Sequence, residues 1–241
     1  MSVGMFAAPS VASPAGPVAP VPQTQTPHLL TTGSGSVDQI RKLVQCGGTM
    51  YAVGSFHLIK RQSVTYMRNN IFSFSATSPF KVTTWDPNVD GVVNSITFNG
   101  GNCANAYIGG KFTMVGGMAA KNIAEVSTTT GMLVSAFKHS AAGMVETVQA
   151  THNHIIAGGF FTSLNGSAAD PYLASLNPVT GSDDGFVHLN VSGNYQFPGV
   201  VSNATRIYNQ ELSHNGNLDL VMGDFTSVGG VPRQQVFMMN V

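Results

Sequence analysis

A short motif that occurs four times is the feature of this sequence that most restricts its fold. Each copy has an apolar stretch, then a glycine, and a phenylalanine two positions after the glycine. The four pairs are Gly54 and Phe56, Gly110 and Phe112, Gly159 and Phe161, and Gly223 and Phe225. Successive phenylalanines are roughly 50 to 65 residues apart, an interval that indicates a tandem array of supersecondary units. The sequence therefore predicts one structural repeat used four times.

Further blocks recur in step with this motif. Three copies continue with Thr-x-Val-x-Gly or a close variant, at 113–117, 162–166 and 226–230. A later block begins at Asn70, Asn122 and, more loosely, Tyr172. Fifteen residues after each asparagine stands a large aromatic residue, Trp85 or Phe137, and Phe186 is predicted to have the same role in the third copy.

The apolar runs indicate strands and not helices. They alternate with polar residues or form short blocks bounded by Gly, Asn and Thr, and none sustains a helical period. In the second copy we expect strands at 93–98, 106–110, 122–126 and 132–137. A glycine inside a strand marks a bulge or a close approach of another backbone. These features predict an all-β protein, a β-propeller of four-stranded antiparallel blades; an unclosed β-sandwich or stacked β-roll is the alternative.

The chain divides into a tail and a repeat region. Residues 1–36 are interpreted as the rear of a signal peptide, or a flexible tail, followed by a Pro-rich linker that packs no core. Residues 37–241 hold the repeats, at approximately 37–91, 92–143, 144–199 and 200–241. The last copy has no fourth strand, so about three and a half blades are expected. Because an open arc leaves strand edges unpaired, we expect a fragment of a longer propeller or a ring completed by self-association.

The repeat resembles the delta-60 family of β-propellers, found mainly in secreted bacterial proteins. The resemblance is carried by Tyr107–Gly117, Asn122–Ala124, Thr130-Gly131 and Trp85–Asn88, and it covers about residues 37–241. It implies a propeller fold and export, but no reaction and no catalytic residue. Kelch-type repeats and fungal cell-polarity propellers are more weakly similar. The first copy departs from the pattern, with a longer and more basic loop at Lys60–Arg68.

The two cysteines fall at corresponding places in adjacent repeats. Cys46 precedes Phe56 by ten residues, and Cys103 precedes Phe112 by nine. Both are therefore expected near the first hairpin of neighbouring blades, on one side of the ring. In an exported protein such thiols would be oxidised to a disulfide; free buried thiols are the alternative.

The charge content excludes several classes of protein. Eleven basic and eleven acidic residues cancel, and charged residues form only 9% of the chain. A protein without a basic surplus is not expected to bind nucleic acid through its phosphates. No run approaches the roughly 18 apolar residues of a membrane-spanning helix, so no membrane span is predicted.

Two sequence patterns suggest a metal site, and each has a plainer interpretation. Asp86–Gly91 matches the start of a calcium loop, but Thr97 occupies the twelfth position where a glutamate is required. His152 and His154 could chelate a transition metal from an extended segment, but no third ligand is near in sequence. We interpret both patterns as polar turns and predict no metal, cofactor or catalytic residues.

The sequence thus predicts a secreted or cell-surface propeller that acts as a non-catalytic binding or scaffold module. The ligand would be a protein or a carbohydrate. The alternative is a polysaccharide hydrolase or lyase on a propeller frame, whose active site lies outside this chain or is not recognisable in it.

Overall fold

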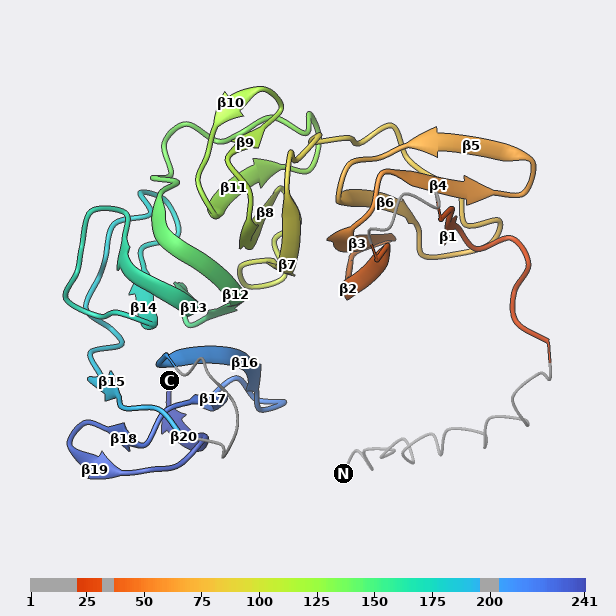
Figure 1. The fold of residues 1–241 in the computed structure, drawn as a ribbon. Helices are drawn as coiled ribbons and strands as arrows, with labels where there is room; N and C mark the ends of the chain where they lie inside the picture. Colours follow the sequence, from red (N-terminus) through yellow and green to blue (C-terminus); the bar gives the residue numbers. More distant parts are fainter. Residues whose placement is uncertain (1–20, 32–36, 196–203) are drawn as a thin grey trace, which may run out of the picture.

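The computed structural model describes residues 21–31, 37–195 and 204–241, and every regular element in these ranges is a β-strand (Figure 1). Four three-stranded antiparallel sheets, here called blades 1 to 4, follow one another along the chain. Blade 1 consists of β2 (Gln39–Cys46), β3 (Thr49–Ser55) and β6 (Ile71–Ser75); blade 2 of β7 (Val92–Thr97), β8 (Asn105–Lys111) and β11 (Ile123–Ser127); blade 3 of β12 (Ala141–Thr151), β13 (His154–Leu164) and β14 (Leu173–Leu176); and blade 4 of β16 (Arg206–Leu212), β17 (Leu218–Asp224) and β20 (Val236–Asn240).

The blades lie side by side in an arc, with blades 1 and 4 at its two ends (Figure 1). Each blade packs face to face on the next, and the first strands contact one another in the series β2, β7, β12, β16. The prediction of an all-β, partial propeller is confirmed. The fourth strand expected in the first three blades is reduced to one bridged pair in each, Phe74 with Val82, Val126 with Leu133 and Leu176 with Asp183. In the second copy, residues 132–137 turn towards the next blade, and the Phe137 amide donates to the Val134 carbonyl.

Apolar side chains fill the spaces between blades. Phe112, Phe161 and Phe225 are almost fully buried, each against the preceding blade. Trp85 and Phe137 are buried in the same interfaces, where they meet Tyr51 and Tyr107 edge to face. These contacts bury the apolar stripe of each repeat, which a single blade could not do alone.

Phe186 does not take the role predicted for it. Its side chain is 39% exposed, and the buried residue is its neighbour Val187. Val187 corresponds in position to Phe137. Each stands four residues before a residue that pairs with the following repeat, Val191 after Val187 and Ala141 after Phe137. Val187 is also the residue that stands fifteen positions after Tyr172, the spacing of Trp85 and Phe137 from their asparagines, whereas Phe186 stands one position earlier.

A bulge recurs in every blade opposite the motif glycine. The first strand of each blade has one extra, unpaired residue directly after the residue that pairs with the motif glycine. These glycines are Gly54, Gly110, Gly159 and Gly223. A Cβ atom on any of these glycines would collide with a carbonyl oxygen of the first strand. The expectation that the glycines mark a bulge with a close backbone approach is confirmed.

The Thr-x-Val-x-Gly continuation forms small hairpins. β9 (Met114–Val115) pairs with β10 (Met118–Ala119), and β18 (Ser227–Val228) pairs with β19 (Val231–Pro232), while β15 (Val191–Ser192) adds to β18. Gly116 and Gly117 have φ values of 57° and 78° in the first of these turns. Such left-handed values explain why glycine stands there.

The first copy has a longer version of this hairpin. The basic segment expected as a loop forms β4 (Leu58–Arg61) and β5 (Val64–Met67), and β1 (His28–Leu29) pairs with β4. Leu29 packs against the buried cluster that contains Phe56 and Ile59. The expectation that the linker packs no core is therefore wrong at residues 28–29, because the hairpin offers β1 an edge to pair with. The predicted signal-peptide remnant lies outside the described residues, and the division of the repeat region stays a prediction.

Candidate functional site

Each of the four bulges places one residue outside the backbone pairing of its blade, and the four residues line one cavity. At each bulge, one residue of the first strand has no partner in the backbone hydrogen-bond ladder of its blade. The skipped residues, here called the channel ring, are Arg41, Asn94, Glu146 and Tyr208. They line a cavity of about 620 Å³ together with Lys42, Ser95, Asn209 and Glu211. The first strands of all four blades thus contribute to one polar site.

Hydrogen bonds link the ring from blade to blade. The Arg41 Nη1 donates to Asn94 Oδ1 at 2.8 Å, and the Asn94 Nδ2 donates to Glu146 Oε2 at 2.9 Å. The Asn94 Nδ2 also donates to the Val145 carbonyl at 3.1 Å. An amide therefore stands between a cation and an anion and fixes the positions of both.

Two nearby arginines offset only part of the effect of burial on the Glu146 carboxylate. Burial raises the pKa of Glu146, while the nearby Arg41 and Arg206 act in the opposite direction. The Arg206 guanidinium carbon lies 5.6 Å from the centre of the Tyr208 ring and 5.4 Å from that of Phe160. Tyr208 itself is half exposed, so the cavity wall includes one accessible aromatic side chain.

A second pair of charges lies beside the ring. The Lys42 Nζ donates to Ser95 Oγ at 3.2 Å. Burial lowers the pKa of Lys42, and the opposite charge of Glu211, from blade 4, partly offsets this effect. Donors from blade 1 and acceptors from blade 4 thus meet across the cavity.

No pattern in the sequence singles out the channel ring. Its members are four different residue types, so no motif is visible. Aligning the repeats on the glycines would have found them, because Ile40, Val93, Val145 and Ile207 each pair with a motif glycine and each is followed by a ring residue.

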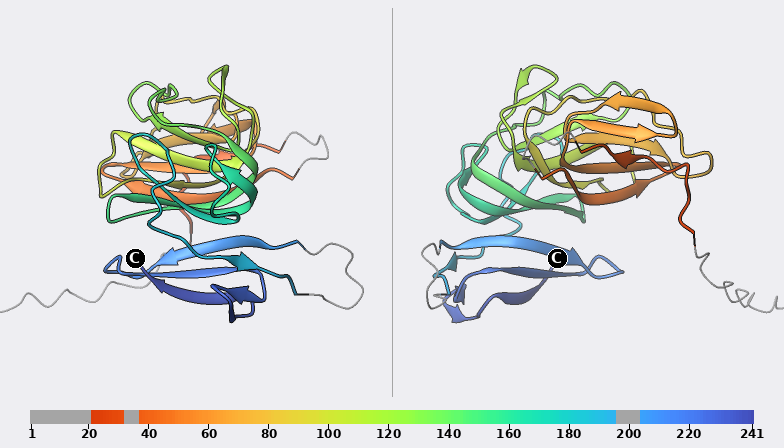
Figure 2. Two further views of the ribbon diagram at one scale, coloured as in Figure 1. Left: turned by 90° about the vertical axis from the view of Figure 1, so that its left-hand side faces the viewer. Right: turned by 45° about the vertical axis from the view of Figure 1, so that its right-hand side comes forward.

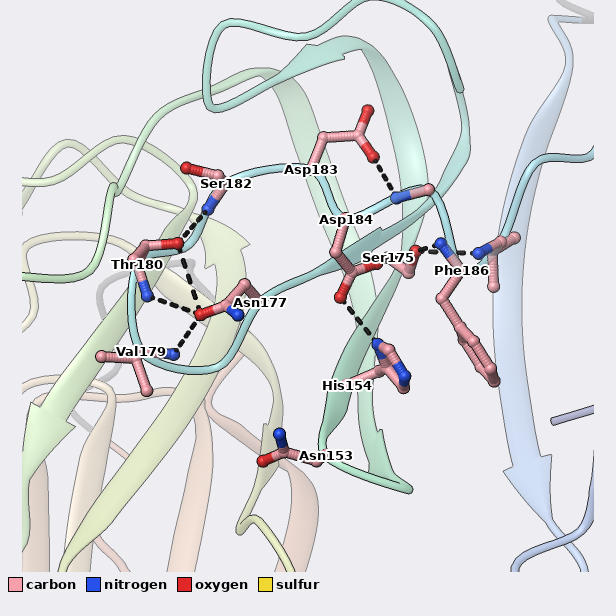
Figure 3. Close-up of polar contacts among 12 residues, drawn as sticks. Asn153, His154, Ser175, Asn177, Val179, Thr180, Ser182, Asp183, Asp184 and Phe186 are labelled. Carbon is pink, nitrogen blue, oxygen red and sulfur yellow. Dashed lines mark hydrogen bonds and ion pairs between the residues drawn. The ribbon is translucent and has the colours of Figure 1, made fainter.

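The histidines considered as metal ligands have separate partners. His154 Nδ1 lies 2.7 Å from Asp184 Oδ2, and its ring stacks on Phe186 with centres 3.9 Å apart (Figure 3). His152 instead contacts Thr151 Oγ1 at 3.0 Å. Ser175, fully buried, donates to the other oxygen of Asp184 at 2.6 Å. Because Ser175 and His154 both bond to the same carboxylate, they do not form a nucleophile and base pair.

The acidic residues of the calcium-like segment also face different partners. Asp90 accepts hydrogen bonds from the amides of Thr113 and Met114, both at 2.8 Å. Asp86 accepts from the Asn88 amide and lies 3.4 Å from Arg68. Within the described ranges, no three or more His, Cys, Asp or Glu residues are grouped so that they could hold a metal ion.

Cys46 and Cys103 form a disulfide, with their Cα atoms 5.7 Å apart. The bond joins the end of β2 to the segment before β8 and so ties blade 1 to blade 2. The predicted bond between adjacent blades is confirmed. Disulfides of this kind persist in oxidising environments.

Among known proteins, the chain is similar in fold to solved structures only. No family model and no curated protein matches the sequence. Among solved structures, the chain is similar to the WD40 β-propeller domain of Doa1, at 14% identity and a TM-score of 0.44. The similarity covers 87% of this chain and 60% of that one. In the residues that the structure describes, no helix is long and apolar enough to cross a membrane.

Proposed function

We propose that this chain is a non-catalytic binding module and that a carbohydrate binds in its central channel. The observation that carries the proposal is the hydrogen-bonded series Arg41, Asn94 and Glu146, which three successive blades supply at one structural position. A site built from several blades is wide enough for a ligand to contact each of them.

The chemistry of the ring favours a polyhydroxylated ligand. Hydroxyl groups both donate and accept hydrogen bonds. The ring offers donors on Arg41, an acceptor on Glu146 and both kinds of group on Asn94. Tyr208 adds an aromatic surface against which the apolar face of a sugar ring can pack. A purely anionic ligand would be repelled by Glu146 and a purely cationic ligand by Arg41, whereas a polyhydroxylated ligand is repelled by neither.

We further propose that the protein is exported and acts outside the cell or at its surface. The disulfide between Cys46 and Cys103 supports this location. The resemblance of residues 107–117 to delta-60 repeats supports it as well. The assignment to that repeat family is part of the proposal.

The test begins with a glycan array and continues with calorimetry on the oligosaccharides retained. Arg41→Ala and Glu146→Gln should each weaken binding about tenfold or more, since each removes a hydrogen bond to a charged group. Arg233→Ala is the matched control, because Arg233 lies after β19 and not in the channel. Its affinity should equal that of the unmodified protein.

Two results would overturn the proposal. One is an array on which no oligosaccharide is retained. The other is binding that both channel variants leave unchanged, which would place the ligand elsewhere. Capture of a protein that binds all three variants equally would instead support a loop-mediated protein ligand.

A further inference from the structure

A small cavity separate from the channel lies between blades 2 and 3 of the arc, which pack face to face (Figure 2). Its volume is about 270 Å³, below the roughly 300 to 1,000 Å³ of sites that hold drug-sized ligands. Blade 2 lines it with residues of β8, β11 and the turn between β7 and β8, and the third repeat adds residues 153, 178 and 179. No residue of the channel ring lines this cavity. Its size suits a small group that binds independently of the channel.

The wall of this cavity contains a buried carboxylate without a cationic partner. Glu125, in β11, is only 4% exposed, and within the described ranges it forms no ion pair. The Asn105 Nδ2 donates to Glu125 Oε1 at 2.8 Å. The Tyr107 hydroxyl is also near the carboxylate, but it donates its single proton to the Pro178 carbonyl at 2.8 Å. Because a buried charge is unfavourable unless it is paired, Glu125 is incompletely compensated.

The corresponding place in blade 3 shows how an acid is balanced within one blade. Counted from the motif glycines, Ser175 stands at the position of Glu125, and it donates to Asp184 at 2.6 Å. His154 stands at the position of Asn105, and its Nδ1 lies 2.7 Å from the Asp184 carboxylate (Figure 3). A protonated imidazole can therefore balance the charge in blade 3. Blade 2 has the acid, but a neutral amide occupies the place of the base.

We propose that this cavity binds a primary ammonium group on a short aliphatic chain, carried by a small amine or by a lysine side chain of another protein. The ammonium would supply the positive charge that Glu125 lacks. Its three N–H donors match the carboxylate and the side-chain amide oxygens of Asn99 and Asn153, which also line the cavity. The aliphatic chain would lie against Val134 and Val179 in the same wall.

The lining disfavours the other classes of charged ligand. An anion would meet the Glu125 carboxylate, and none of the described lining residues is Lys, Arg or His. A calcium ion takes six to eight oxygen ligands, whereas this cavity has one carboxylate. The amide oxygen of Asn102 is already bonded to the Ala104 amide at 3.0 Å. An ammonium needs fewer oxygen atoms and a single opposite charge, which this cavity provides.

NMR titration of the full chain with n-butylammonium chloride tests the site, and 1-butanol is the uncharged probe of the same length. The ammonium should bind at least tenfold more tightly than the alcohol. Glu125→Gln should weaken ammonium binding about tenfold or more, because it removes the charge and keeps an oxygen for Asn105. Asp86→Asn is the matched control, since Asp86 lies outside the cavity. Its affinity for the ammonium should equal that of the unmodified protein.

A second variant tests the cavity while Glu125 stays in place. Val179 is 67% exposed at the edge of the cavity, so substitutions there should not disturb the fold. Val179→Lys brings a tethered ammonium to the site and should weaken binding of the free probe about tenfold or more. Val179→Met has a side chain of similar length without the charge, and it should bind the probe as the unmodified protein does.

A further arm of the titration, with Nα-acetyl-lysine methylamide, identifies the source of the ammonium. Tighter binding of this probe than of n-butylammonium would support a lysine side chain of a protein, and the reverse order would support a free amine. Equal binding of the ammonium and the alcohol would overturn the proposal. Unchanged ammonium binding in Glu125→Gln or in Val179→Lys, or a preference for calcium chloride over both amines, would overturn it as well.

Discussion

At the scale of single residues, the glycine opposite each bulge is the position where a side chain is least tolerated. Gly159 faces the Met144 carbonyl so closely that no Cβ atom fits without moving the backbone. The same constraint holds in all four blades, which explains the recurrence of this glycine better than strand propensity does, since glycine weakens a strand.

Gly159→Ala should therefore lower the free energy of unfolding by about 3 kcal/mol, the upper range for overpacking. Gly48→Ala serves as the control, because no atom lies near the place of its Cβ. That variant should change stability by less than about 0.5 kcal/mol. Urea unfolding followed by tryptophan fluorescence measures both, and equal effects would contradict the steric explanation.

The buried residue Asp219 should make the stability of the protein depend on pH. Asp219, in β17, is fully buried, and neither of its carboxylate oxygens has a hydrogen-bond partner among the described residues. Burial, with a smaller contribution from the charge of Glu211, raises its pKa from 3.8 to about 7. The folded state then holds the proton more tightly than the unfolded chain. The stability that this proton provides is complete below pH 4 and is lost as the pH rises to 7.

Asp219→Asn should remove this dependence. At pH 8 the variant should be more stable than the unmodified protein by a few kcal/mol, on the order of 4, whereas at pH 4 the two should be similar. Urea unfolding at a series of pH values measures the difference. A constant difference between pH 4 and pH 8 would show that Asp219 has no raised pKa.

At the scale of elements, the disulfide is the covalent link between two blades. It closes a segment of 57 residues, for which the chain-entropy estimate is about 4 kcal/mol. The double substitution Cys46→Ser and Cys103→Ser should lower the unfolding free energy by this order. Reducing the unmodified protein should have the same effect, and adding reductant to the double variant should have none. An unchanged unfolding midpoint would contradict a stabilising role.

The elements that repeat were predictable from the sequence, and those that do not repeat were not. Alternation and the glycine motif indicate β7 and β8 because their pattern recurs in four copies. The strand expected at 132–137 is absent because its residues turn towards the next blade after a single pair, Val126 with Leu133. The pairing of β1 depends on a long-range contact with β4, which no local pattern reveals. The channel ring was missed because its position is constant while its residue types differ.

At the scale of the whole molecule, each blade contacts only its neighbours, as in other repeat proteins. Blades 2 and 3 are packed on both faces, whereas blade 4 is packed on one. Local unfolding should therefore be easiest in blade 4.

Hydrogen exchange can measure this gradient. Amides of β17 should exchange at least tenfold faster than those of β13. This ratio corresponds to about 1.4 kcal/mol in opening free energy. Uniform exchange across the four blades would indicate that the arc unfolds as one unit.

The repeated bulge separates the residues that specify the scaffold from those that could set ligand preference. Replacing Arg41, Glu146 or Tyr208 should leave the strand register unchanged, because the ladder skips these positions. A library varied only at the channel ring would therefore sample many binding chemistries on one unchanged frame. Each repeat contributes one ring residue, and the hydrogen bonds from Arg41 through Asn94 to Glu146 couple the choices made in neighbouring blades.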